Sequence, residues 1–196
     1  LVCNSVLQGE KAQLCWTDPP WNVAYGESKH PSWKKRTIEN DNLGDKFPLF
    51  AENFCKRIAG GLVSGAPIYM AMSAQEWPVI DDALRSSGFH WSSTIIWAKD
   101  SLVLSRKDYH TQYEPIWYGW LDGAPRISTV DDRTQSDLWQ IDRPRRSDEH
   151  PTMKPVQLVS RSIANSSDKG DLVFEPFSGS GTTIIACENM GRKCRA

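Results

Sequence analysis

The sequence lacks the features that mark secreted, disulfide-bonded, zinc-binding or membrane-spanning chains. Its five cysteines are scattered and odd in number, and they form neither a Cys-x-x-Cys pair nor a His/Cys cluster. Neither a disulfide framework nor a zinc site is therefore predicted. No stretch approaches ~20 consecutive apolar residues, and no secretory signal is present. We expect a protein without metal or membrane contact, in a reducing cytoplasm.

The sequence also has no excess of positive charge. The net charge is −1, whereas nucleic-acid-binding domains often carry a visible positive excess. The basic residues gather in two stretches, 29–36 and 143–146. These hold the candidate nucleic-acid contacts Lys29, Lys34, Lys35, Arg36, Arg143, Arg145 and Arg146, although a charge run by default is solvated surface. Nine tryptophans suit a protein that handles flat aromatic rings.

Length and apolar spacing predict one α/β domain over residues 1–196. We expect helices over 47–59, 75–87, 155–165 and 182–190, and strands over 1–3, 12–16, 67–72, 91–98, 113–120 and 171–175. Their alternation predicts a doubly wound, mostly parallel sheet with helices on both faces, and antiparallel additions near the aromatic strands. Another strand begins at Lys193, so we expect a piece of a longer protein, truncated at its C-terminal end.

A proline-bounded turn follows the apolar run 12–16. Each proline in Asp18-Pro19-Pro20-Trp21 fixes φ and lacks an N–H, so strand pairing stops there. The turn holds a carboxylate, a bare carbonyl and an aromatic face at the rim of the sheet, where ligands of open α/β sheets bind. The alternative is an ordinary strand-to-loop turn with an Asp cap.

A second strand end carries the glycine-rich stretch Phe177-Ser-Gly-Ser-Gly-Thr182, followed by a helix. Glycine lets the backbone approach a ligand, and a helix start presents free N–H groups. A Walker-type loop would need a lysine after Gly181, and the dinucleotide pattern would need a third glycine where Ile184 stands. This leaves a nucleoside-type cofactor without a triphosphate, or a purely structural turn.

The two motifs together resemble the amino-methyltransferases that use S-adenosylmethionine and methylate exocyclic amines of nucleic-acid bases. Their order, catalytic motif first, is that of the beta group of DNA methyltransferases. A third stretch, His150-Pro-Thr-Met-Lys154-Pro155, is similar to the His-Pro-Thr-x-Lys-Pro stretch that precedes the cofactor strand in that group. The three motifs cover nearly the whole chain, and the resemblance implies a Rossmann-like fold with permuted motif order.

The resemblance also implies site residues. The catalytic set is Asp18, Pro19, Pro20 and Trp21. The cofactor contacts are Asn4, Lys154, Pro155, Glu175, Phe177, Ser178, Gly179, Gly181 and Thr182. Lys154 is expected near the carboxylate of the cofactor and Asn4 near its adenine. Glu175 stands where the family commonly has Asp, and its alternative is a plain strand-end polar residue.

The chemistry agrees with these roles. An exocyclic amine is a poor nucleophile because its lone pair is delocalised into the ring. Asp18 and the Pro19 carbonyl can each accept one of its N–H groups, and such preorganised acceptors meet the charge that develops on nitrogen. Trp21 would stack on a base that has been flipped out of the duplex.

We therefore expect a site-specific methyltransferase that acts on adenine N6 of double-stranded DNA, since Asp rather than Ser opens the motif. Cytosine N4, RNA adenine N6 and a catalytically silent nucleic-acid-binding domain are the alternatives. The resemblance admits a homodimer and a cognate restriction endonuclease as partners. Residues 121–149 are predicted to leave the core as a short target-recognition insertion. For His110 and Glu114 we prefer a plain strand-end pair over the active-site rim.

Overall fold

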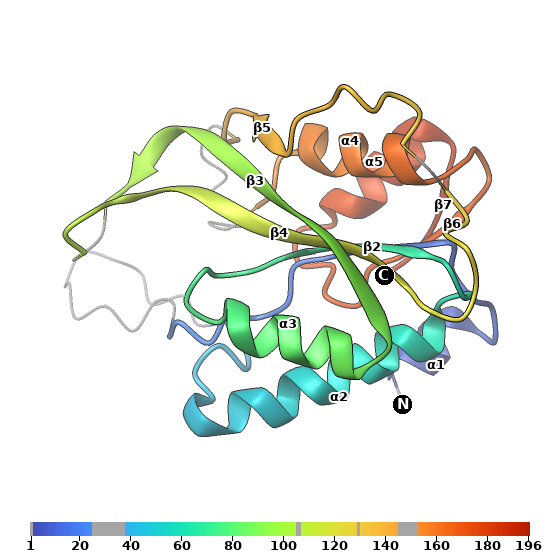
Figure 1. The fold of residues 1–196 in the computed structure, drawn as a ribbon, viewed down its shortest axis with the longest axis horizontal. Coiled ribbons are helices and arrows are strands. Elements are labelled where there is room, and N and C mark those ends of the chain that lie inside the picture. Colours follow the sequence, from blue (N-terminus) through green and yellow to red (C-terminus); the bar gives the residue numbers. More distant parts are fainter. Residues whose placement is uncertain (1, 25–37, 105–106, 129, 145–152) are drawn as a thin grey trace.

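A seven-stranded sheet between helices forms the body of the molecule (Figure 1). The structure is a computed structural model that describes residues 2–24, 38–104, 107–128, 130–144 and 153–196, with side chains from Ser5 onward. The strands are β1 (Leu14–Thr17), β2 (Pro67–Ala71), β3 (Phe89–Val103), β4 (Thr111–Leu121), β5 (Leu138–Gln140), β6 (Leu172–Phe174) and β7 (Lys193–Arg195). Their order across the sheet is β5-β3-β4-β2-β1-β6-β7.

The sheet is mostly parallel, as predicted. β1 pairs in parallel with both β2 and β6, β7 pairs in parallel with β6, and β5 does so with β3. β4 runs antiparallel to both of its neighbours, which confirms the expected antiparallel addition among the aromatic strands. The parallel arrangement puts the carboxyl ends of β1 and β6 side by side at one edge of the sheet.

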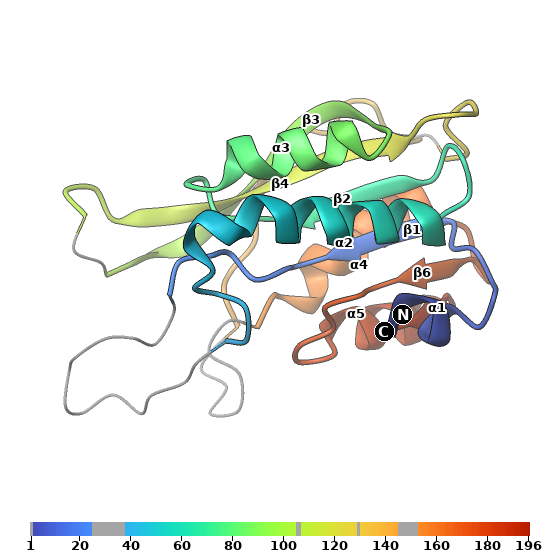
Figure 2. The same cartoon turned by 90° about the horizontal axis from the view of Figure 1, so that it is seen from below.

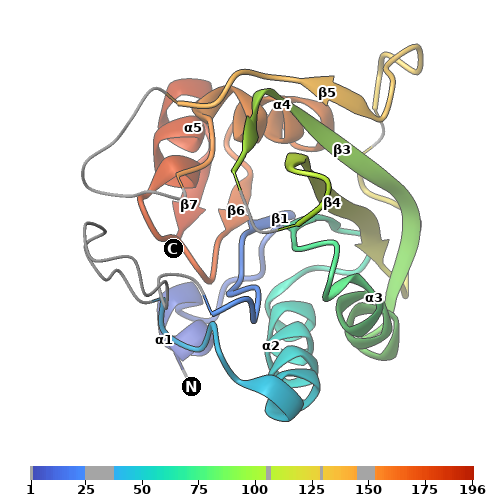
Figure 3. The same ribbon diagram turned by 90° about the vertical axis from the view of Figure 1, so that its left-hand side faces the viewer.

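Helices cover both faces, again as predicted (Figures 2 and 3). One face carries α2 (Phe47–Gly61) and α3 (Trp77–Ser86), with the short helices α1 (Val2–Leu7) and η1 (Gly44–Lys46) beside α2. The other face carries α4 (Val156–Ser166) and α5 (Thr182–Met190). Among the described residues, none of the helices has both the length and the apolar character needed to span a membrane.

The core consists of two layers because successive strand residues point to opposite faces. On β1, Cys15 packs into the layer under α2 and α3, while its neighbours Leu14 and Trp16 pack under α4 and α5. The Trp16 indole N–H donates to Ser162 Oγ of α4 across 3.2 Å. β1 is therefore fixed from both faces, which gives the residues that follow it a rigid support.

Two predictions of local structure are wrong. Val2 and Cys3, expected as part of a strand, belong instead to the start of α1, whose Leu7 is buried beside α2. Residues 121–149, expected outside the core, contain the edge strand β5. Apolar and polar residues alternate along β5 and the residue after it, so that Trp139 and Ile141 are buried, at 3% and 5% exposure. This alternation is too short to predict a strand inside a segment rich in Asp, Arg and Pro.

Candidate active site

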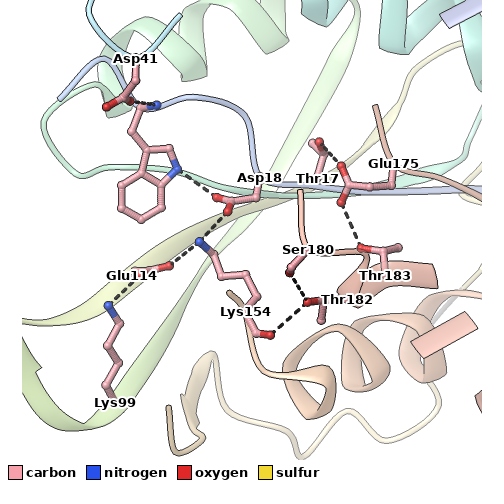
Figure 4. A network of polar contacts seen from close by, with 11 residues as sticks. Thr17, Asp18, Asp41, Lys99, Glu114, Lys154, Glu175, Ser180, Thr182 and Thr183 are labelled. Atoms are coloured by element: carbon pink, nitrogen blue, oxygen red, sulfur yellow. Dashed lines mark hydrogen bonds and ion pairs between the residues drawn. The ribbon is translucent and has the colours of Figure 1, made fainter. Parts of the chain in front are cut away.

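The proline-bounded corner lies where it was predicted, directly after β1. The strand ends at Thr17, and Asp18 follows with a side chain that is 22% exposed. Pro19 is buried and Pro20 is half-buried. Because β1 lies between β2 and β6, the corner faces residues from several strands and from the segment before α4 (Figure 4).

Both oxygens of the Asp18 carboxylate are engaged by side chains of this chain. The Trp21 indole Nε1–H donates to Oδ1 across 3.0 Å, and the Lys154 ammonium donates to Oδ2 across 2.6 Å. The same ammonium lies 4.7 Å from the centre of the Trp21 ring, in a cation–π contact. Lys154 therefore contacts both the carboxylate and the aromatic ring of the proline-bounded corner.

A buried chain of alternating charges continues from this point into the β3–β4 hairpin (Figure 4). Lys154 Nζ lies 3.2 Å from Glu114 Oε2 of β4, and Glu114 Oε1 accepts from Lys99 Nζ of β3 across 2.7 Å. The side chains of Lys99, Glu114 and Lys154 are 6%, 12% and 6% exposed. Burying a charge is costly unless an opposite charge lies beside it, and here every member has such a partner.

The electrostatics of the network follow from this burial. Removal from water raises the pKa of Asp18, and the Glu114 charge adds to the increase, while Lys154 and Trp21 oppose it. Burial also acts to raise the pKa of Glu114, but Lys154 and Lys99 outweigh it, so this pKa is lowered. Burial acts to lower the pKa of Lys154, but the two carboxylates outweigh it and raise the pKa. Lys154 is therefore a permanent cation within the site.

The backbone of the corner is held by a further buried carboxylate, that of Asp41. Its Oδ1 accepts from the Trp21 amide across 2.8 Å, and its carbonyl accepts from the Ala24 amide across 2.7 Å. The neighbouring Asn22, at a left-handed φ of 56°, accepts from the amide of Leu43 across 2.7 Å. Sequence reasoning missed this support because Asp41 lies in a polar connection without periodicity.

The second strand end is organised by Glu175, which directly follows β6 and is 2% exposed. Its Oε1 accepts from the Thr17 hydroxyl across 2.8 Å and from the Phe177 amide across 3.0 Å, and its Oε2 accepts from the Thr183 hydroxyl across 3.0 Å. Burial raises the pKa of Glu175 to about 8, and these hydrogen bonds oppose it. Glu175 thus joins the last residue of β1 to the glycine turn and to α5.

The glycine turn has a backbone conformation that favours glycine. Gly179 and Gly181 adopt φ values of 50° and 76°, the left-handed region that other residues rarely occupy. A side-chain carbon added at either position would meet no atom closer than 3.8 Å, so the backbone is open on that side. α5 begins at Thr182 with no side-chain capping hydrogen bond among the described residues. Its first N–H groups have no partner within the helix and suit a carboxylate.

The two motifs meet through β1, β6 and the segment before α4. Cys15 is in register with Phe174, so Asp18 and Glu175 leave adjacent strands. The Thr182 hydroxyl of the glycine turn donates to the Lys154 carbonyl across 3.3 Å. Lys154 therefore contacts the glycine turn with its backbone and the proline-bounded corner with its ammonium. The predicted contact of Lys154 with the carboxylate of the cofactor stays a prediction.

The other predicted cofactor contacts have these places. Phe177 packs edge-on against Phe54 of α2, with ring centres 5.4 Å apart, and the Ser178 carbonyl accepts from the Gly181 amide across 2.8 Å. Pro155 directly precedes α4, and its carbonyl accepts from the Leu158 amide across 3.1 Å. Asn4 belongs to α1, and its side chain is not described.

The predicted nucleic-acid contacts are mostly outside the described residues. This applies to Lys29, Lys34, Lys35, Arg36, Arg145 and Arg146. Arg143 is described, and it contacts the carboxyl-end half of β3. Its amide donates to Asp100 Oδ1 across 2.9 Å, and its guanidinium donates to Ser101 Oγ across 2.7 Å. Its side chain is 38% exposed, which leaves part of its positive charge at the surface.

Sequence reasoning missed the role of Glu114. For Glu114 the preferred interpretation, a plain strand-end residue, is wrong, because its carboxylate contacts both Lys99 and Lys154. A signal was present: Lys99 and Glu114 are charges on two strands rich in aromatic residues, and a charge that is buried requires a partner. The register that puts Glu114 opposite Trp97, two residues from Lys99, could not be read from one sequence.

Comparisons with known proteins identify the family of this chain. Residues 12–195 match the N6/N4 methyltransferase family, described as DNA methylase. The chain is 31% identical to the type II methyltransferase M2.MboI of Moraxella bovis, over 93% of this chain and 74% of that protein. It is 29% identical to the DNA adenine methyltransferase YhdJ of Escherichia coli K12, over 95% of this chain and 71% of that protein.

Solved structures show the same fold. The crystal structure of the M1.HpyAVI–SAM complex superposes with a TM-score of 0.75 at 21% identity, covering 98% of this chain and 85% of that one. The cytosine-N4-specific PvuII DNA methyltransferase gives 0.72 at 18% identity, covering 97% and 77%. The Rossmann-like prediction is thereby confirmed. The match across residues 12–195 shows that the chain belongs to the N6/N4 DNA methylase family, and it is an S-adenosylmethionine-dependent DNA methyltransferase.

Proposed function

We propose that this methyltransferase modifies N6 of adenine in double-stranded DNA. The observation that carries the proposal is the carboxylate of Asp18, presented at the carboxyl end of β1 beside the glycine turn after β6. Asp at this motif position, rather than Ser, favours adenine over cytosine N4. The Escherichia coli relative named a DNA adenine methyltransferase supports the same choice. The fold alone does not distinguish the two bases, since the structurally similar PvuII enzyme is named cytosine-N4-specific.

The residues of the corner would activate the amine by accepting its two N–H groups. Asp18 accepts one and the Pro19 carbonyl the other, which favours a localised lone pair on nitrogen and stabilises the charge that develops there. The site would also hold the amine nitrogen in line with the methyl group and the sulfur of the cofactor. Such alignment can lower the activation barrier by ~7–11 kcal/mol in favourable cases. The bound cofactor supplies an electrophilic methyl group. Asp18 need not be a strong base, because the methylated ammonium is acidic enough to lose its proton to water.

Base flipping is part of the proposal, because a base inside a duplex cannot reach the corner after β1. Trp21 would stack on the flipped base, a contact of roughly 1–3 kcal/mol. The basic residues of 29–36 and 143–146 are proposed to contact phosphates near the flipped base. Residues 121–149 are proposed to recognise the target sequence, although β5 anchors part of this segment to the sheet.

The glycine turn is proposed to hold the cofactor. Its left-handed glycines and the uncapped start of α5 suit the carboxylate and the nucleoside part of S-adenosylmethionine. The relative named a type II methyltransferase supports a restriction–modification setting in the cytoplasm. A homodimer and a cognate endonuclease are the partners to look for in that setting, by sedimentation of the purified chain and by co-purification.

Transfer of a tritiated methyl group tests the proposed base. Unmethylated DNA, RNA and protein are offered in parallel with labelled S-adenosylmethionine, and the labelled DNA is digested to nucleosides. We expect label in N6-methyladenine, at one short sequence when the modified adenines are mapped. Label at cytosine N4, or in RNA alone, would overturn the choice of substrate, and absence of label from every acceptor would favour the silent-domain alternative.

A further inference from the structure

Lys154 occupies both places that an incoming base would need. Its ammonium holds Asp18 Oδ2 at 2.6 Å and lies over the Trp21 ring at 4.7 Å. The other Asp18 oxygen accepts from the Trp21 indole. A base that stacks on this face of Trp21 and donates its amine to Asp18 Oδ2 therefore requires the ammonium to move.

An acceptor for the displaced ammonium is already in place. Glu114 Oε2 is buried and has no hydrogen-bond partner in the part of the chain that the structure describes, although Lys154 Nζ lies 3.2 Å away. Hydrogen bonds between an ammonium and a carboxylate have lengths of about 2.7–2.9 Å, so a shift of about 0.3–0.5 Å would form one. The second oxygen of Glu114 accepts from Lys99, which fixes the orientation of the carboxylate.

The difference between the two donors explains why such an acceptor is needed. A neutral amine forms a weaker hydrogen bond to a carboxylate than an ammonium does. Without Glu114, Asp18 would be the only counter-charge of the buried ammonium, and the amine could not displace Lys154 from it. Glu114 removes this obstacle, because the ammonium stays paired while Asp18 becomes available.

We propose that Lys154 closes the amine site in the absence of substrate, and that Glu114 is the positioning residue that receives its ammonium when the base enters. The inference rests on the proposed function only in that Asp18 receives an exocyclic amine, and it applies equally to adenine and cytosine. Lys99 keeps Glu114 in place, and its own carbonyl accepts from Gln112 across 3.0 Å.

The first test is Glu114→Gln, which keeps the shape of the side chain and removes its charge. Single-turnover methyl transfer is measured at pH 8.5 and saturating cofactor, on the duplex whose modified base has been mapped. We expect the rate to fall about 10- to 100-fold, the equivalent of one hydrogen bond to a charged group, with cofactor affinity unchanged within about threefold. Glu52→Gln, on the exposed surface of α2, is the matched acid-to-amide control.

The decisive comparison repeats Glu114→Gln in a Lys154→Met background. Without an ammonium to receive, the loss of the Glu114 charge should cause no further fall in rate. Glu114→Gln also removes a negative charge that raises the pKa of Asp18, so in this background we expect a modest increase in rate. A fall of the same size in both backgrounds would show that Glu114 acts only through the fold of the β3–β4 hairpin, and would overturn the proposal.

A binding measurement covers the case in which Lys154→Met is too slow to assay. Cofactor-free affinities are compared for the mapped duplex and for the same duplex with a target base that lacks its exocyclic amine. The gain in affinity that the exocyclic amine confers should be smallest in Glu114→Gln and largest in Lys154→Met. An equal advantage in wild type and both variants would refute the displacement. If the label maps to cytosine, the choice of adenine fails, while this comparison still decides the role of Glu114.

Discussion

The ends of β1 and β6 are neighbours in one sheet, yet they are built in different ways. The corner after β1 depends on side-chain charge: Asp18 is held by Lys154, which is balanced by Glu114 from a distant hairpin. The turn after β6 depends on backbone conformation, with left-handed Gly179 and Gly181 and a buried carboxyl that accepts hydrogen bonds from three sides.

This difference suits the tasks proposed for the two strand ends. A catalytic carboxylate must change partners as substrate enters, and exchangeable ion pairs allow that change. A cofactor cradle keeps one shape, and backbone conformation preserves it without mobile charges. Changes of charge should therefore affect mainly the corner, and changes of backbone freedom should affect mainly the turn.

The largest expected effect comes from Asp18→Ala. Removing the acceptor should lower the rate of methyl transfer by at least about 100-fold, the loss seen for a single preorganised hydrogen-bonding group. Cofactor affinity, measured by calorimetry, should stay within a few-fold because the glycine turn is intact. Lys154 would keep Glu114 as its counter-charge, so the fold should persist.

Asp45→Ala provides the control for Asp18→Ala, since Asp45 is an exposed acid in η1. It should leave both the rate and the cofactor affinity unchanged. If Asp18→Ala instead abolished cofactor binding while Asp45→Ala did not, Asp18 would belong to the cofactor site, and the division between the two strand ends would be wrong.

The same contrast explains what could be predicted from sequence. The two strand ends were readable because proline and glycine impose local backbone geometry, whatever surrounds them. The role of Glu114 and Lys99 was not readable in this way. It depends on the register between β3 and β4 and on Lys154, which is distant in sequence. The helical conformation of α1 also depends on tertiary packing, because six residues are too few for their spacing to distinguish a helix from a strand.

Gly181→Ala should affect the turn and spare the corner. An alanine at φ 76° is strained by about 1–2 kcal/mol, and relief of that strain would alter the backbone that we propose faces the cofactor. We expect the KM for S-adenosylmethionine to rise at least about tenfold, the equivalent of 1.4 kcal/mol, while kcat at saturating cofactor falls much less. Steady-state kinetics with varied cofactor measure both values.

Gly170→Ala separates strain from position, because Gly170 has a φ of 93° and open space around it, outside the glycine turn. It should lower stability to a similar extent without changing the KM for the cofactor. Equal increases in KM for the two variants would mean that loss of stability, rather than the shape of the turn, determines cofactor binding.

Glu175→Gln tests whether the buried carboxyl after β6 is a neutral anchor. Its pKa rises from 4.5 to about 8 on folding, so the folded state binds the proton more tightly. The associated stability is present in full below about pH 4.5 and is lost as pH rises towards 8, by at most about 1.4 kcal/mol per pH unit. Urea unfolding between about pH 5 and about pH 8 should show this slope reduced in Glu175→Gln. Glu188→Gln, at an exposed position of α5, should keep the wild-type slope.

The smallest effects should come from the two hydroxyls that bind Glu175 from opposite sides. Thr17→Val removes the hydrogen bond from β1, and Thr183→Val removes the one from α5, each at a cost of about 1 kcal/mol in unfolding free energy. Because Thr17 directly precedes Asp18, its loss should lower kcat a few-fold, whereas loss of Thr183 should raise the KM for the cofactor. Kinetics that changed in the same way for both variants would mean that Glu175 couples the two strand ends into a single unit, in which the corner and the turn cannot be altered separately.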